Sequence, residues 1–275
     1  ERFAGAVETY TLEALMRDRK ALQAGTSHYL GQNFAKAYGV QFQSREGGLE
    51  HAYATSWGVS TRLVGAVIMT HGDDKGLRLP PALAPIEVVI VPIYRSDEER
   101  GSVVELCHRL AGDLGDHRIR VDDRDDVRPG FKFNEWELRG VPLRVEVGPR
   151  DLEAKRATVV PRLTGEKQEV ALSGLDDWLQ RALGEAQDGL LAQAREFRDR
   201  HTFRPKDMSE MATLIDDPGG FMLAGWCGSE ECEAKVKAET KASIRFLPLE
   251  PTSPGGRCIV CGQPAVDEAA WAQGY

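Results

Sequence analysis

The chain has 275 residues, of which 41% are apolar and 28% are charged, an ordinary composition for a globular protein of about two or three domains. Its longest apolar runs, such as residues 63–69, are far shorter than the roughly 18 residues that a membrane-spanning helix needs. The net charge of −8 argues against nonspecific coating of nucleic acid but leaves room for a local basic face. The first residues carry no secretion signal and no initiator Met, so we expect a cytoplasmic fragment or processed piece without a membrane partner.

The first third of the chain mixes strand and helix patterns. Residues 9–16 and 21–28, separated by a turn-like Asp-Arg-Lys, predict a β-hairpin. Residues 30–39 predict a short helix that ends at Gly39, and residues 60–69 form an apolar stretch of helix length. Three prolines within residues 79–85 indicate a linker. The motif HGDDKG at 71–76 could be read as a metal or phosphate site, but we interpret it as a polar loop between domains.

The middle of the chain alternates strand and helix patterns. The expected strands are at 86–94, 118–125 and 141–148, and the expected helices at 102–115 and 131–140. This order predicts a small α/β domain with a mostly parallel or mixed sheet. Cys107 falls on the apolar side of the first helix, where we interpret it as a small core residue. A long amphipathic helix over 174–201 then leads to a Cys- and Gly-rich C-terminal segment that suits a small stapled domain.

Four of the five cysteines lie near the C-terminus, as two close pairs: Cys227 with Cys232, and Cys258 with Cys261. Two such pairs on two turns can place four thiolates at the corners of a tetrahedron, which is the geometry that Zn²⁺ accepts. Gly228 and Gly262 directly follow a cysteine, as tight chelating turns require. We therefore predict a structural zinc site, with free thiols or an iron–sulfur cluster as the alternatives.

Three stretches resemble prolyl-tRNA synthetases of the archaeal and eukaryotic-like type. They are ALQAGTSHYLGQNF at 21–34, the segment from TSWGVSTR to VIVPI at 55–93, and DDRDDVRPGFKFNEWELRGVPLRVEVGPRD at 122–151. The cysteine pairs and the final Tyr275 are similar too. The resemblance implies the end of a class II antiparallel-sheet catalytic domain at 1–83, an α/β anticodon-binding domain at 84–190 and a zinc-containing α+β domain at 191–275. The family's first and second signatures and its Thr-x-Glu loop are not in the chain, so we expect them upstream.

The resemblance also implies sites for ATP with Mg²⁺ and for L-proline. Arg62 matches the third-signature arginine that lies along ATP and is the expected catalytic residue, while Gln23, Thr26 and Ser60 match positions that bind ATP. His28, Trp57 and Gly58 match the proline pocket. An arginine is planar and permanently charged, which suits stacking on adenine and contact with phosphate. The simpler interpretations are a surface arginine at a helix start, a satisfied histidine and a tryptophan packed in a core.

In the second domain, the resemblance assigns anticodon recognition to Glu137 and Arg144, with Lys132 and Lys167 as less certain helpers. Proline codons begin with CC, so the last two anticodon bases are guanines. A carboxylate matches guanine's N1–H and N2–H donors, and an arginine matches its O6. The simpler interpretation is an exposed, salt-bridged helix end.

The function predicted from these patterns is that of the C-terminal part of a prolyl-tRNA synthetase, which activates proline with ATP and transfers it to tRNA(Pro). We expect the full-length enzyme to be a homodimer and the isolated chain to be inactive. One alternative is a non-catalytic tRNA-binding or regulatory module. Another is a zinc-stabilised structural subunit that docks other synthetases and has no affinity for tRNA.

Overall fold

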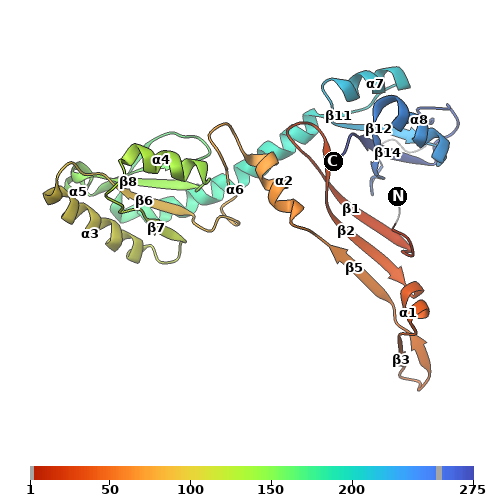
Figure 1. Cartoon of the computed structure of the whole chain (residues 1–275), viewed down its shortest axis with the longest axis horizontal. Coiled ribbons are helices and arrows are strands. Elements are labelled where there is room, and N and C mark those ends of the chain that lie inside the picture. The colour runs from red at the N-terminus through yellow and green to blue at the C-terminus, as the bar shows by residue number, and fades with distance from the viewer. Residues whose placement is uncertain (1–2, 252–255) are drawn as a thin grey trace. The chain divides into compact units, whose positions relative to one another are not determined.

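A computed structural model describes residues 3–251 and 256–275 (Figure 1). The chain divides into two compact units. One contains the described residues up to Thr70 together with those from Phe197 onward, and the other contains His71–Glu196. Within the described residues, no helix is both long enough and apolar enough to cross a membrane.

The unit at His71–Glu196 is built on one mixed sheet of five strands, in the order β10-β9-β8-β6-β7. Strands β8, β6 and β7 are parallel, whereas β9 and β10 run antiparallel to their neighbours, as predicted for a parallel or mixed sheet. The elements are β6 (Val88–Pro92), α3 (Asp97–Asp113), β7 (Ile119–Val121), α4 (Pro129–Leu138), β8 (Leu143–Val147), α5 (Pro149–Ala154), β9 (Arg156–Pro161), β10 (Gln168–Ala171), the short 3₁₀ helix η1 (Leu172–Gly174) and α6 (Leu175–Arg200).

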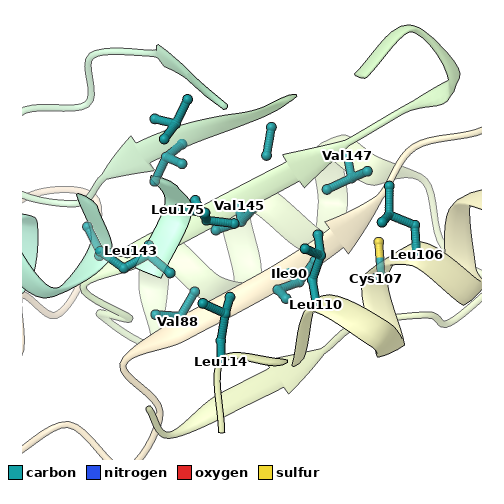
Figure 2. Close-up of a cluster of buried hydrophobic side chains, with 14 of the residues drawn as sticks. Val88, Ile90, Leu106, Cys107, Leu110, Leu114, Leu143, Val145, Val147 and Leu175 are labelled. Carbon is teal, nitrogen blue, oxygen red and sulfur yellow. The ribbon is translucent and has the colours of Figure 1, made fainter. Parts of the chain in front are cut away.

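The apolar run of β6 is explained by burial on both faces of this sheet. Val88 and Ile90 pack with residues of α3 and α6 in the larger core cluster, which Figure 2 shows around Leu143, Val145 and Val147. Val89 and Val91 face the other way, against Trp136 of α4. A central strand covered by helices on both sides can be apolar at every position. Cys107 is fully buried in the larger cluster, which confirms its interpretation as a core residue.

Helix α3 begins five residues earlier than predicted. Ser96 accepts a hydrogen bond from the Glu99 backbone N–H, and the first turn contains Asp97, Glu98 and Glu99. Acidic side chains favour the positive end of the helix dipole. This polar first turn lacks the apolar spacing on which the sequence-based boundary depended, so the capping signal was missed.

The N-terminal part of the other unit contains the predicted hairpin. Strands β1 and β2 pair antiparallel, and β2 also pairs with β5 in a three-stranded sheet. Helix α1 ends at Gly39, as predicted, and the φ of 68° at this residue gives a left-handed cap. The elements are β1 (Glu8–Leu15), β2 (Ala21–Gly31), α1 (Asn33–Tyr38), β3 (Gln41–Gln43), β4 (Leu49–His51), β5 (Ala54–Gly58) and α2 (Arg62–His71).

The C-terminal part of this unit has a sheet of its own, which the sequence had not specified. Its four strands lie in the order β11-β12-β14-β13, and two helices accompany them. A cluster of buried residues around Trp271 and Met211 forms its core. The elements are β11 (Thr202–Phe203), α7 (Met208–Asp216), β12 (Phe221–Trp226), α8 (Glu230–Thr240), β13 (Ser243–Phe246) and β14 (Asp267–Ala272). The final residues reach back to β2, where Gly274 bridges Ala21.

Candidate functional site

The sheet of β1, β2 and β5 gathers three of the predicted ATP and proline residues on one face. Leu12 pairs with Gly25 and Glu13 pairs with Gln23, so Ala24 is an extra residue, that is, a β-bulge in β2. A bulge reverses the alternation of side chains along a strand. Gln23, Thr26 and His28 are opposite Glu13, Thr11 and Thr9 respectively, which alternate along β1 and therefore share a face.

Hydrogen bonds join these side chains. Gln23 Nε2 donates to Thr11 Oγ1 at 3.3 Å, and the Thr9 hydroxyl lies 3.0 Å from His28 Nδ1. Arg62, at the start of α2, donates from Nη1 to the Gln23 carbonyl oxygen at 3.4 Å. Its backbone N–H donates to Ser60 Oγ at 3.3 Å. Two of the predicted ATP residues, Arg62 and Gln23, are thus neighbours.

The two remaining predicted proline residues lie on opposite faces of this sheet. Gly58 is opposite Thr26, so it shares the face of the predicted ATP residues. Trp57 is opposite Ser27 and therefore lies on the other face, where 80% of its surface is exposed. The structure does not bring Trp57 together with His28, and it does not pack this tryptophan in a core either.

In the α/β unit, Glu137 and Arg144 line the same pocket of about 160 Å³. Glu137 comes from the last turn of α4, and Arg144 comes from β8, which follows after a tight turn. Lys75 and Arg162 also line the pocket. Lys75 forms a 3.4 Å ion pair with Glu137, and Arg162 donates from Nε to the Glu137 carbonyl oxygen at 3.1 Å. The pocket thus offers hydrogen-bond donors from three basic side chains and an acceptor from one carboxylate.

Arg144 is held from two sides. Its guanidinium carbon lies 4.4 Å from the centre of the Phe133 ring, and its Nη2 is 3.0 Å from Glu146 Oε1. Lys167 meets the other oxygen of the same carboxylate at 2.9 Å. Glu146, whose side chain is only 5% exposed, therefore orients two of the predicted residues. Sequence reasoning missed it, although Arg144 and Glu146 share a face by simple strand alternation.

Lys132 does not reach this pocket. Its side chain is 2% exposed, and its ammonium group donates to the Asp122 carbonyl oxygen at 2.9 Å. Burial lowers the pKa of Lys132. Asp122 also accepts from Trp136 Nε1 at 2.7 Å and from Arg124. Burial opposes ionisation of Asp122, but these hydrogen bonds outweigh it and lower its pKa to about 2. Lys132 therefore belongs to a buried polar network on the inner side of α4, together with Asp122 and Trp136.

The HGDDKG loop is tied to the same unit. Asp73 accepts from both Nη1 and Nη2 of Arg162, at 2.9 and 2.5 Å, and these hydrogen bonds lower the pKa of Asp73 to about 2. Across the described ranges, the four C-terminal cysteines form the single cluster of three or more potential metal ligands. His71, Asp73 and Asp74 therefore do not form the metal-binding trio that the motif suggested.

The four cysteine sulfur atoms lie within 4.8 Å of one another. Cys227 follows β12 directly, and Cys232 lies in the first turn of α8. Cys258 and Cys261 belong to a turn closed by a hydrogen bond from the Gly262 N–H to the Cys258 carbonyl oxygen. Gly228 and Gly262 have φ values of 82° and 71°, a backbone region that favours glycine, as predicted. Four converging sulfur ligands could hold a metal ion, and this donor set is typical of closed structural zinc sites.

Backbone amides support a thiolate at one position of this cluster. Burial disfavours the ionised form of Cys258, but N–H groups of Cys261, Val260 and Cys227 outweigh it and lower its pKa to about 6. Burial raises the pKa of Cys232 to about 12, and hydrogen bonds among the thiols act in the same direction. A bound cation would favour the thiolate at every position, because metal ligation requires deprotonated cysteine.

Two parts of the chain match known protein families. Residues 87–182, which contain the pocket of Glu137 and Arg144, match the family described as "Anticodon binding domain". The chain thus carries a domain of the tRNA-recognising class. Residues 208–275, which contain the four cysteines, match "Prolyl-tRNA synthetase, C-terminal".

Similarity to curated proteins extends over the whole chain. The chain is 50% identical to the proline–tRNA ligase of Cytophaga hutchinsonii, 49% identical to that of Bacteroides fragilis and 46% identical to proline–tRNA ligase 2 of Clostridioides difficile. Each alignment covers 100% of this chain and 56%, 56% and 57% of the respective relative, so the chain spans about half the length of these proteins. The chain belongs to the prolyl-tRNA synthetase family and corresponds to its C-terminal region.

Proposed function

We propose that this chain is the part of a proline–tRNA ligase that recognises the proline anticodon and supplies residues to the adenylation site. The observation that carries the proposal is the shared pocket of Glu137 and Arg144 within the segment that matches an anticodon-binding domain. The full-length enzyme would join L-proline to ATP as prolyl-adenylate and transfer the prolyl group to tRNA(Pro).

In the anticodon pocket, Glu137 would accept hydrogen bonds from N1–H and N2–H of a guanine, and Arg144 would donate to O6. Arg144 is pre-oriented by Phe133 and Glu146, which lowers the entropy that base binding must overcome. Lys75 is 68% exposed, so its ion pair with Glu137 costs little to open when a base enters. Lys167, 62% exposed beside Glu146, would contact RNA phosphate.

At the adenylation site, Arg62 would stack along ATP and oppose its negative charge, while Gln23, Thr26 and Ser60 offer amide and hydroxyl groups to the nucleotide. Mg²⁺ bound with ATP would supply neutralisation of phosphate charge. His28 and Gly58, on the same sheet face, would bind proline. Trp57 lies on the opposite face of the sheet, so we propose no direct contact between its side chain and proline bound beside His28.

The four cysteines would hold one structural Zn²⁺, because all of them converge and the donor set leaves no fifth ligand among the described residues. We further propose that the enzyme is cytoplasmic and, at full length, a homodimer. We propose that the catalytic, anticodon-binding and zinc-containing domains span 1–83, 84–190 and 191–275.

A non-catalytic tRNA-binding module is the other candidate, and one experiment separates the two functions. A full-length enzyme carrying this chain should catalyse ATP–pyrophosphate exchange that depends on proline. Arg62→Ala should reduce this exchange by roughly 100-fold, and Arg62→Lys should not restore it because lysine lacks the planar stack. Exchange that is absent in the parent, with tRNA(Pro) binding intact in a filter assay, would favour the binding module.

A further inference from the structure

Arg245 connects the C-terminal sheet to a residue of the proposed ATP face. Arg245 of β13 donates from Nε and Nη2 to Glu13 Oε2, at 3.1 and 2.9 Å. The Glu13 side chain is 2% exposed and that of Arg245 is 18% exposed. A charge pair so shielded from water is costly to break from one side, because the remaining carboxylate would be buried without a counter-charge.

The position of Arg245 depends on a local irregularity of its strand. Ile244 pairs with Trp271 and Phe246 pairs with Ala270, so Arg245 is the extra residue of a β-bulge. Bulges re-aim a side chain out of the regular alternation and recur beside active sites. Gly274 leaves room for the guanidinium, since a Cβ at this position would lie 2.6 Å from Arg245 Nη1.

Hydrogen bonds connect Glu13, which Arg245 holds in place, to the side chain of Gln23 through Thr11. While Oε2 accepts from Arg245, Oε1 accepts from the Thr11 hydroxyl at 3.2 Å. The alternative acceptor for that hydroxyl, the Gly25 carbonyl oxygen, is further away at 3.5 Å. With its proton directed to Glu13, Thr11 Oγ1 is an acceptor for Gln23 Nε2. The network thus fixes which end of the Gln23 amide faces Thr11, so that Oε1 is the end that would remain for a ligand.

We infer that Arg245 is a positioning residue for ATP, acting through Glu13 and Thr11 on the side-chain amide of Gln23. This inference rests on the proposed function, and it gives the cysteine-containing domain a role in the adenylation site. Without Arg245, the Glu13 carboxylate would lose its counter-charge and the contacts that hold it in place, so Thr11 would lose its preferred acceptor and Gln23 could present either end of its amide to the nucleotide.

The test is proline-dependent ATP–pyrophosphate exchange in a full-length enzyme carrying this chain. Arg245→Ala should raise KM for ATP roughly tenfold, the effect of one misplaced hydrogen bond, and leave KM for proline within about twofold. Gly274→Ala should raise KM for ATP less, because it displaces the guanidinium without removing its charge. Arg245→Lys should recover part of the loss, since lysine can restore the charge but only one of the two contacts.

Arg204→Ala is the matched control. Arg204 pairs at 2.5 Å with Glu268, whose side chain is also 2% exposed, but Glu268 is on β14 rather than on β1. Both alanine variants leave a buried carboxylate in this unit, so general destabilisation should affect them alike. Equal changes in KM for ATP in the two variants would overturn the inference, as would an unchanged KM in Arg245→Ala.

A double variant distinguishes action through Gln23 from an independent effect. Arg245→Ala combined with Gln23→Ala should be no worse than Gln23→Ala alone, because both changes remove the same contact to ATP. Multiplicative losses would contradict the inference and leave the proposed function intact. A parent enzyme without proline-dependent exchange would instead overturn the proposed function, and this inference with it.

Discussion

The anticodon-binding domain and the cysteine-containing domain are held together in different ways. In the first, seventeen buried residues from strands and helices form one core cluster, most of them Val and Leu. In the second, the corresponding cluster contains eight of the described residues, and three of these are alanines. A small core rarely supplies enough stability for an independent domain, and a metal centre is one common remedy. We therefore expect stability to be distributed over many side chains in one domain and to depend, in the other, on a metal ion held by the four cysteines.

Removal of the metal site should therefore have the largest effect, and it should affect only the cysteine-containing domain. Cys232→Ser, or chelation of the metal, should unfold residues 208–275 and leave residues 87–182 folded. A structural zinc site of this kind contributes about 10–16 kcal/mol of apparent binding free energy that is coupled to folding. Hydrogen exchange of the β12 and β8 amides would follow the two domains separately.

Cys107→Ala is the control for this change, because Cys107 is a buried cysteine of the other domain. It should destabilise only the anticodon-binding domain, by about 1 kcal/mol for a small cavity, and leave the metal content unchanged. Elemental analysis that finds one zinc per chain in the parent and in Cys107→Ala, but less in Cys232→Ser, would support the assignment. A metal-free parent that keeps residues 208–275 folded would refute it.

A single truncation in the larger core should have a smaller effect. Leu179 on α6 is fully buried, so Leu179→Ala should destabilise the anticodon-binding domain by about 2–5 kcal/mol, from lost transfer energy and the cavity left behind. Urea unfolding measures the change. The metal content should not fall, and loss of zinc in this variant would show that the two domains do not differ in the way described.

The smallest of these effects should be electrostatic. Asp73 has a pKa of about 2 in the folded chain, below its value of 3.8 without these contacts, so its pairing with Arg162 stabilises the fold above about pH 4. That contribution should be lost as the pH falls toward 2. Asp73→Asn should cost about 1 kcal/mol at pH 7, since Asp73 is partly exposed. A cost measured by urea unfolding that persists unchanged at pH 2.5 would contradict this account.

Local patterns predicted those features that depend on near neighbours in the sequence. The apolar run of β6 indicated a buried strand, and the spacing of the cysteine pairs indicated their convergence. The cap at Gly39 followed from glycine's freedom at positive φ. The β6 run, the Gly39 cap and each cysteine pair lie within a few residues, whereas the meeting of the two pairs was inferred from the four ligands that a zinc ion takes.

Features set by register and distant pairing could not be predicted in the same way. The bulge at Ala24 places Gln23 on the face of Thr26 and His28, and the neighbouring Gly25 is its only sign within residues 21–28. Lysine is usually exposed on a helix, and only the fold shows that Lys132 donates a hydrogen bond to the buried Asp122 carbonyl oxygen. The contact between Arg245 and Glu13 joins residues 232 positions apart. Long-range pairing of this kind is absent from single-sequence periodicity.

The most direct measurement of the central claim is the coupling between the anticodon and its proposed readers. In a full-length enzyme carrying this chain, Glu137→Ala or Arg144→Ala should lower kcat/KM for aminoacylation of tRNA(Pro) by roughly tenfold or more, as expected for a base contact worth about 1–3 kcal/mol. Proline-dependent exchange without tRNA should hardly change. A tRNA with one anticodon guanine replaced should show a similar loss with the parent enzyme, and the matching alanine variant should add little to it. Fully multiplicative losses would mean that Glu137 and Arg144 do not read these bases, and would contradict the account.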